Sequence, residues 1–347
     1  MRRMRWLAGV LAAAVMGALS GQPPPPLPPV NPAAARLDAT LGGLDAPGVG
    51  VVVTDGGLLV AACENGSLHY WDRDAQFGVR GGDHPPTRVA GHAAPLIALA
   101  AVPGGVATAG GGDCKIVLWS LPAEKATATL DGGGVVRALA TSPDGKTLAS
   151  VGDGGKVTLW DVAAGKSTAT LDGAHDWQLA VAFSPDGKAV AAGGYDGKWR
   201  LWDVAGGKKV LEVEAHAPPP PNMPPPSSAN VVHALAFSPD GKTLAVGGAD
   251  GQILLFQLPD GKFLRALVGH GSAVTGLAFH PGGQLLASAS KDRTVRLWNP
   301  ASPQPLKNLE GHTNWVQGVV FLAQGTRLAS VGADDTVRLW DLTEPKK

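Results

Sequence analysis

An aromatic residue closes a short β-strand pattern seven times along this chain of 347 residues. Successive anchors are separated by 48, 41, 42, 54, 42 and 42 residues. A period near 42 residues with four short β-patterns per unit is typical of sheets repeated radially around an axis. The repeat therefore predicts a ring of seven small sheets, which uses nearly all of the chain. The anchors are Trp71, Trp119, Trp160, Trp202, Phe256, Trp298 and Trp340.

Turn residues recur with the same period as the anchors. The run Ser-Pro-Asp-Gly-Lys stands between two apolar strand patterns at 142–146, 184–188 and 238–242. Proline presets one backbone dihedral of a tight turn, and Asp-Gly suits the positions that branched residues avoid. Each run therefore predicts a hairpin that joins two strands of one sheet.

The period, the hairpin runs and the closing Trp-Asp pairs together resemble the WD40-repeat family. The resemblance extends over residues 36–342, about nine-tenths of the chain. It implies an all-β fold, a seven-bladed β-propeller of four-stranded antiparallel blades. It also implies that loops on the face carrying the Gly-His and Asp turns are where partners commonly bind.

The family pattern places a His ahead of each unit and an Asp six residues before the anchor. Both are missing from the first and third units, where Asn65 and Gly154 occupy the Asp position. Paired loss is expected if the two side chains share a hydrogen bond, because a buried partner left alone costs about 1–3 kcal/mol. We therefore interpret these residues as structural clasps rather than general bases or metal ligands. The pairs are His92 with Asp113, His175 with Asp196, His216 with Asp250, His270 with Asp292, and His312 with Asp334.

The last unit lacks sequence for its fourth strand, since only six residues follow Asp341. Upstream of the first unit, residues 36–41 echo residues 125–130, the fourth strand of another unit. We therefore expect the N-terminal segment to complete the last blade and close the ring, which removes exposed sheet edges.

The N-terminus resembles an export signal. Arg2, Arg3 and Arg5 precede an uncharged apolar stretch of about 14 residues, short of the ~20 that span a bilayer. We expect a signal peptide over 1–20, a Pro-rich tether over 21–35, the propeller over 36–342 and a tail over 343–347. The protein is then exported, periplasmic or secreted; a retained anchor and a cytoplasmic protein are the alternatives.

Composition and motifs favour binding over catalysis. Basic and acidic residues balance at 29 each, so no net field attracts nucleic acid, and we expect no stable membrane insertion after signal cleavage. The chain carries no haem-attachment, phosphate-loop or nucleophile-elbow motif, so we expect no enzyme, no cofactor and no metal. The alternative, an enzyme or small-ligand binder using the central channel, requires inward polar residues, whereas the first strands are mainly Val, Leu and Ala.

Two tryptophans outside the anchor period mark a candidate binding surface. Trp177 and Trp315 follow the His positions of units four and seven, with Tyr195 and Lys291 at matching turns nearby. Tryptophan is favoured at interaction hot spots, although packing on neighbouring loops is an equal alternative. An insertion with seven prolines at 217–228 enters the same face, as a spacer or a polyproline ligand. The prediction is a monomeric scaffold for a protein or peptide partner.

Two further features are open at this stage. Cys63 and Cys114 are either small buried residues or, in an exported protein, a disulfide. Arg200, Arg296 and Arg338 share one position in the third strand, and we expect a solvated, outward-facing column.

Overall fold

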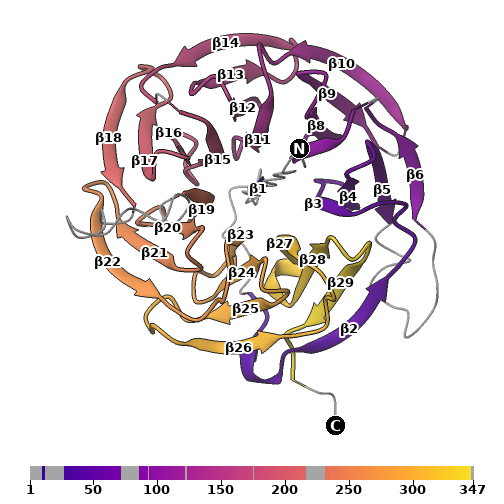
Figure 1. Cartoon of the computed structure of the whole chain (residues 1–347), viewed down its shortest axis with the longest axis vertical. Helices are drawn as coiled ribbons and strands as arrows, with labels where there is room; N and C mark the ends of the chain where they lie inside the picture. The colour runs from indigo at the N-terminus through magenta and orange to yellow at the C-terminus, as the bar shows by residue number, and fades with distance from the viewer. Residues whose placement is uncertain are drawn as a thin grey trace, which may run out of the picture.

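Seven four-stranded antiparallel sheets surround a central axis in the computed structural model (Figure 1). The structure describes residues 10–11, 27–71, 86–92, 94–121, 123–174, 176–215 and 231–344. Blades are numbered 1 to 7 by their anchors, from Trp71 to Trp340. The predicted seven-bladed all-β propeller is confirmed. The Pro-rich insertion lies outside the described residues, as does the predicted signal peptide apart from β1 (Val10–Leu11), which pairs in parallel with β11.

In blades 1 to 6 the chain passes from the innermost to the outermost strand, whereas in blade 7 the outermost strand comes first in the chain. The innermost strands are β3 (Gly48–Val53), β7 (Leu96–Val102), β11 (Val136–Thr141), β15 (Gln178–Phe183), β19 (Val232–Phe237), β23 (Val274–Phe279) and β27 (Val316–Leu322). The second strands are β4 (Leu59–Cys63), β8 (Gly105–Gly110), β12 (Thr147–Gly152), β16 (Ala189–Gly194), β20 (Thr243–Gly248), β24 (Leu286–Ser290) and β28 (Arg327–Gly332).

The outer half of each blade holds the anchor strand and an edge strand. The third strands are β5 (Ser67–Trp71), β9 (Lys115–Ser120), β13 (Val157–Asp161), β17 (Lys198–Asp203), β21 (Ile253–Gln257), β25 (Val295–Trp298) and β29 (Val337–Asp341). The fourth strands are β6 (Thr87–Ala90), β10 (Lys125–Asp131), β14 (Lys166–Leu171), β18 (Lys209–Glu214), β22 (Lys262–Leu267), β26 (Pro305–Leu309) and, for blade 7, β2 (Arg36–Leu41). Two short 3-10 turns, η1 (Pro32–Ala34) and η2 (Ala323–Gly325), complete the elements.

The core lies between neighbouring blades. Each innermost strand packs against those of the two adjacent blades, and its residues are nearly all buried. Small residues are needed where blades converge: a Cβ on Gly276 would lie 3.3 Å from the Gly318 Cα of the next blade. The anchors are buried between the sheets, with no more than 8% of any anchor exposed. The fourth strands are largely exposed, because only one of their faces meets the next blade.

The Ser-Pro-Asp-Gly-Lys runs form the predicted hairpins. The Ser142 hydroxyl donates to Asp144 Oδ1 at 2.6 Å and accepts from the Thr147 backbone N–H at 2.9 Å. Gly145 has a φ of 73°, which glycine adopts without strain. The repeated sequence thus specifies the same turn in blades 3, 4 and 5.

Strand β2 closes the ring, as predicted from the sequence. It pairs antiparallel with β29, in register from Arg36 opposite Asp341 to Leu41 opposite Val337 (Figure 1). An ion pair between Arg36 and Asp341 at 2.5 Å adds to the ladder. The described end of the Pro-rich segment also packs on blade 7: the Asn31 backbone N–H donates to the Leu342 carbonyl at 2.7 Å, and Ala35 is buried.

Deleting residues 1–41 is expected to lower the thermal unfolding midpoint and to promote self-association, because β29 then becomes an unpaired edge. Calorimetry and analytical ultracentrifugation measure the two effects. Deletion of residues 1–26 is the control, since it keeps η1 and β2. Equal behaviour of the two truncated proteins would show that the ring does not depend on this pairing.

Candidate functional site

The predicted His–Asp clasps form in blades 2, 6 and 7, and each belongs to a longer polar chain. In blade 7, His312 Nδ1 lies 2.9 Å from Asp334 and its Nε2 lies 2.8 Å from Ser330 Oγ, which also accepts from the Trp340 indole N–H at 2.9 Å. Gly332 leaves room for this chain, because a Cβ there would approach both His312 and Asp334 to 2.6 Å. The same chain joins His92, Asp113, Thr108 and Trp119 in blade 2, and His270, Asp292, Ser288 and Trp298 in blade 6.

Both ring nitrogens of His312 take part in this chain. Nδ1 lies against the Asp334 carboxylate, and Nε2 lies against the Ser330 hydroxyl, which accepts from the indole N–H of Trp340. Burial acts to raise the pKa of Asp334, but hydrogen bonds from His312, Thr313 and Thr336 outweigh it and bring the pKa to about 2. Every polar atom of the chain is thereby used, which is the arrangement of a structural clasp.

Blade 4 holds its turn Asp with an arginine. Arg200 lies 2.6 Å from Asp196 and 3.0 Å from Glu212, and only 2% of the residue is exposed. The expectation of a solvated, outward-facing arginine is therefore wrong at this position, because two carboxylates compensate its burial. His175 and His216 lie outside the described residues, so the clasps predicted with Asp196 and Asp250 are not described.

Blade 3, which lacks both clasp residues, uses a different ion pair. Arg137, near the start of β11, pairs through its guanidinium with Asp153, the residue before the expected Asp position. The same guanidinium lies 4.3 Å from the centre of the Trp177 ring in blade 4. This ion pair therefore joins the loop of one blade to an aromatic residue of the next.

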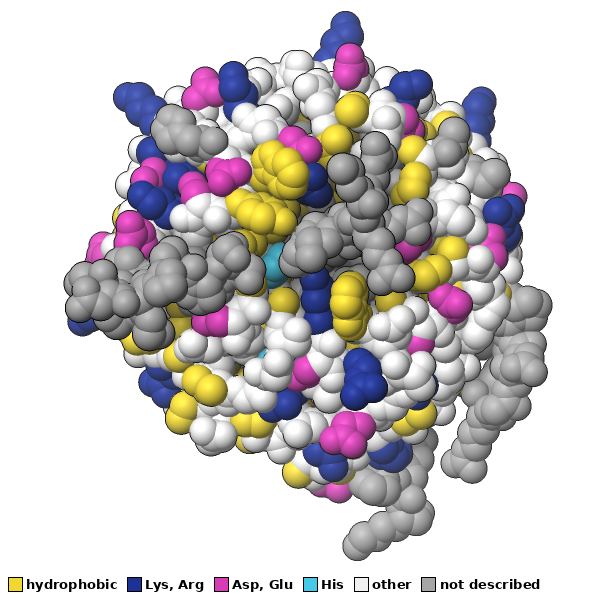
Figure 2. All heavy atoms as spheres, viewed as in Figure 1, with side chains coloured by type: hydrophobic (Ala, Val, Ile, Leu, Met, Phe, Trp, Pro, Cys, Tyr) yellow, Lys and Arg dark blue, Asp and Glu magenta, His cyan; other side chains and the backbone are white. Residues whose placement is uncertain are grey.

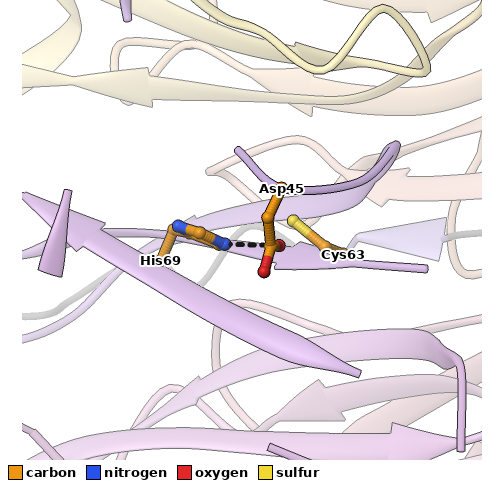
Figure 3. A group of neighbouring side chains, drawn as sticks. All are labelled: Asp45, Cys63 and His69. Atoms are coloured by element: carbon orange, nitrogen blue, oxygen red, sulfur yellow. Dashed lines mark hydrogen bonds and ion pairs between the residues drawn. The ribbon is translucent and has the colours of Figure 1, made fainter. Parts of the chain in front are cut away.

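Blade 1 replaces the clasp with a cluster of side chains from three segments (Figure 3). Asp45, ahead of β3, accepts from Ser67 at 2.6 Å and from Arg88 at 2.6 Å, and its Oδ1 lies 2.9 Å from His69 Nε2. Cys63 is fully buried beside them, and burial raises the pKa of its thiol to about 12.

This cluster is not a Ser-His-Asp catalytic triad. Ser67 Oγ lies 3.1 Å from His69 Nε2, the same nitrogen that contacts Asp45. A triad needs hydroxyl and carboxylate on opposite ring nitrogens, so that the base can receive the hydroxyl proton. Cys63 and Cys114 are both free, so the alternative of a disulfide between them is not formed.

The predicted binding residues form two aromatic–polar groups on the loop face. Trp177 and Tyr195 pack edge to face with ring centres 5.4 Å apart in blade 4, and 40% of Trp177 is exposed. Across the ring, Lys291 of blade 6 places its ammonium 4.9 Å from the centre of the Trp315 ring of blade 7, and 43% of Trp315 is exposed. Figure 2 shows hydrophobic side chains beside Lys and Arg near the middle of the face in view. The structure therefore brings the four residues together as two separate pairs.

A ring of β-bulges near the same face was not predicted. At the start of every innermost strand, the pairing with the second strand skips one residue. The skipped residues are Val49, Ile97, Arg137, Leu179, His233, Thr275 and Gln317. Each stands 22 or 23 positions before its anchor, so aligning the repeats on the anchors would have revealed them.

Among the bulged residues, His233 and Thr275 are polar and buried. Burial and the charge of Lys291 lower the pKa of His233 to about 4. The Thr275 hydroxyl donates to the Val316 carbonyl of the next blade at 2.5 Å.

Comparison with known families agrees with this architecture. The model of the WD domain, G-beta repeat, matches residues 124–161, 165–203, 261–299 and 303–341. The model of the anaphase-promoting complex subunit 4 WD40 domain matches residues 221–270, and together the matches span more than half of the chain. The chain belongs to the WD40-repeat family. None of the curated proteins compared with it matches significantly.

WD40 propellers are generally non-catalytic scaffolds for protein interactions. In this WD40 propeller, the polar chains of blades 2, 6 and 7 lie within single blades, and each buried histidine uses both ring nitrogens in hydrogen bonds. The described residues include no helix that is long and apolar enough to cross a membrane. Trp177 and Trp315 are the two tryptophans among the exposed large hydrophobic residues of the described chain.

Replacing Asp334 with Ala is expected to lower the free energy of unfolding by about 1–3 kcal/mol, because the buried Nδ1–H of His312 loses its acceptor. Urea unfolding followed by tryptophan fluorescence measures the change. Asp260→Ala, in an exposed turn, is the matched control. A double variant with His312→Ala should cost less than the sum of the single variants; strict additivity would contradict the clasp.

Proposed function

We propose that this WD40 propeller is a non-catalytic scaffold that binds a protein or peptide partner on its loop face. The observation that carries the proposal is the exposure of two tryptophans, 40% for Trp177 and 43% for Trp315, where every anchor is buried. A large exposed aromatic gains most from a partner that covers it, which is why tryptophan is enriched at hot spots.

Each tryptophan is held in place by a neighbouring cation. Arg137 stands over Trp177 and is itself oriented by Asp153, while Lys291 stands over Trp315. Cation–π contacts of this kind are worth about 0.5–1 kcal/mol at exposed sites. They restrict the side chains before binding, so less conformational entropy is lost when a partner arrives.

The positions of the two pairs favour an extended partner. Trp177 and Tyr195 belong to blade 4, whereas Lys291 and Trp315 join blades 6 and 7, on the far side of the ring. A peptide segment or loop that crosses the axis would contact both pairs. We therefore favour an extended segment with apolar side chains that cover both tryptophans.

The polar bulges favour a second candidate, a small ligand at the mouth of the channel. Arg137, His233, Thr275 and Gln317 come from four blades at the same level of the ring. Gln317 Oε1 is buried and has no hydrogen-bond partner in the described part of the chain. A small polar ligand would depend on Gln317 and His233, whereas a peptide partner would depend on the tryptophans.

Replacing Trp177 and Trp315 with Ala is expected to abolish partner capture with little effect on the thermal unfolding midpoint, because both side chains are exposed. Quantitative mass spectrometry of the proteins captured by wild type and by the variants measures partner capture. Calorimetry measures the thermal unfolding midpoint. Phe263→Ala is the matched control, an aromatic residue 53% exposed on the outer strand β22. Loss of stability without a change in captured proteins would mean that the tryptophans only pack on their loops.

We further propose that the protein is exported, on the strength of the basic start and apolar stretch within residues 1–20. Export with signal cleavage predicts a mature N-terminus near residue 21. N-terminal sequencing of protein from the native cell envelope or medium tests this. A protein that keeps Met1 and fractionates with the cytoplasm would overturn the proposal.

A further inference from the structure

Blade 1 brings together three different metal-ligating groups that the binding surface does not use. Asp45 comes from the loop ahead of β3, Cys63 from the end of β4 and His69 from the middle of β5 (Figure 3). Their ligating atoms, a carboxylate oxygen, a thiol sulfur and an imidazole nitrogen, all lie within 4.8 Å of one another. The other blades with described clasps use a Ser or Thr, a His and an Asp, so the thiol is particular to blade 1.

The chemistry of this donor set selects among metals. Sulfur and imidazole nitrogen are poor ligands for Mg²⁺ and Ca²⁺, whereas one thiolate, one imidazole and one carboxylate suit Zn²⁺ in tetrahedral coordination. Cys63 is fully buried and His69 is 2% exposed, but the Asp45 side chain is 33% exposed. Solvent therefore reaches the cluster on the Asp45 side, which gives an entry path and a water as fourth ligand.

Neighbouring side chains fit a metal bound through one carboxylate oxygen. Arg88 donates to Asp45 Oδ2 at 2.6 Å, which orients the carboxylate so that Oδ1 faces His69 Nε2 and the Ser67 hydroxyl, and Ser67 has to release Oδ1 when a metal binds there. Among the described residues, the buried His69 Nδ1 has no hydrogen-bond partner, so moving the ring proton from Nε2 to Nδ1 breaks no hydrogen bond at Nδ1. Two ligand atoms on a tetrahedral Zn²⁺ lie about 3.3–3.7 Å apart. His69 Nε2 and Asp45 Oδ1 are 2.9 Å apart, so they need to separate by less than about 1 Å to bind the same ion.

We propose that Asp45 Oδ1, Cys63 Sγ and His69 Nε2 form a zinc site on blade 1. Binding replaces the His69–Asp45 hydrogen bond with coordination bonds to both residues and to the Cys63 sulfur. The thiol proton passes to solvent, and the ring proton of His69 moves from Nε2 to Nδ1, so the imidazole stays neutral. The metal then ties the loop ahead of β3 to two strands of its blade, where other blades use a clasp. The site is independent of partner binding at Trp177 and Trp315.

Cobalt is a direct probe, because tetrahedral Co²⁺ bound to a thiolate absorbs in the near ultraviolet and visible. Titration of the metal-free full chain with Co²⁺ should produce a thiolate-to-cobalt band that saturates at one equivalent and disappears on addition of Zn²⁺. Cys63→Ser and His69→Gln should abolish the band. Cys114→Ser, which removes the other free thiol, and Trp177→Ala should keep it.

Zinc should also raise the thermal unfolding midpoint of wild type and Cys114→Ser, but not of Cys63→Ser, since a ligand bound only by the folded state stabilises it. Circular dichroism of each metal-free variant confirms that it folds. If Co²⁺ gives no thiolate band with wild type, or the same band with a folded Cys63→Ser, the site does not exist. The cluster is then only a hydrogen-bonded replacement for the clasp.

Discussion

The structure depends on closing a sheet array into a ring, and one strand pair does this. Strand β2 supplies the fourth strand of the blade whose other three strands end the chain. Without this pair, β29 would be an unpaired edge, and blades 1 and 7 would be joined only by packing of their innermost strands. Because each innermost strand packs on both neighbours, the position of every loop follows from closure. The two aromatic pairs lie on opposite sides of one face only in a closed ring.

Within the ring, polar side chains stabilise the loop that enters a blade, and the residues that do this differ from blade to blade. Blades 2, 6 and 7 use a histidine between a carboxylate and a hydroxyl. Blade 4 uses a buried arginine between two carboxylates, and blade 3 uses an ion pair that reaches an aromatic residue of the next blade. In blades 2, 3, 4, 6 and 7, a carboxylate at a turn near the same face of the ring is paired with a histidine or an arginine. The carboxylate recurs among these blades, and the side chain that pairs with it varies.

The sequence predicts the periodic part of this molecule well. The anchors, the hairpins and the closing segment 36–41 each depend on local patterns, such as turn dihedrals and alternating burial, that a single repeat displays. The Ser, Thr and Trp members of the polar chains were not predicted, because the hydrogen bonds that join them cross strands. Arg200 was assigned to solvent because its carboxylate partners come from a neighbouring strand and turn. The blade 1 cluster was not predicted for the same reason, since Asp45 and His69 are 24 positions apart in the chain.

Function in a repeat protein is best sought where a blade departs from its neighbours. A residue present in most blades is explained by the requirements shared by all blades, so it carries little information about a partner. Trp177 and Trp315 differ from the buried anchors because they are exposed. Arg137 and His233 are polar residues at bulges that hold apolar residues in blades 1, 2 and 4. Cys63 differs because it places a thiol beside a histidine. The first two departures lie around the channel mouth, where one partner can contact several blades. The third is confined to blade 1, and a ligand there can act only by fixing that blade, which is why we assign it a metal ion and the mouth a partner.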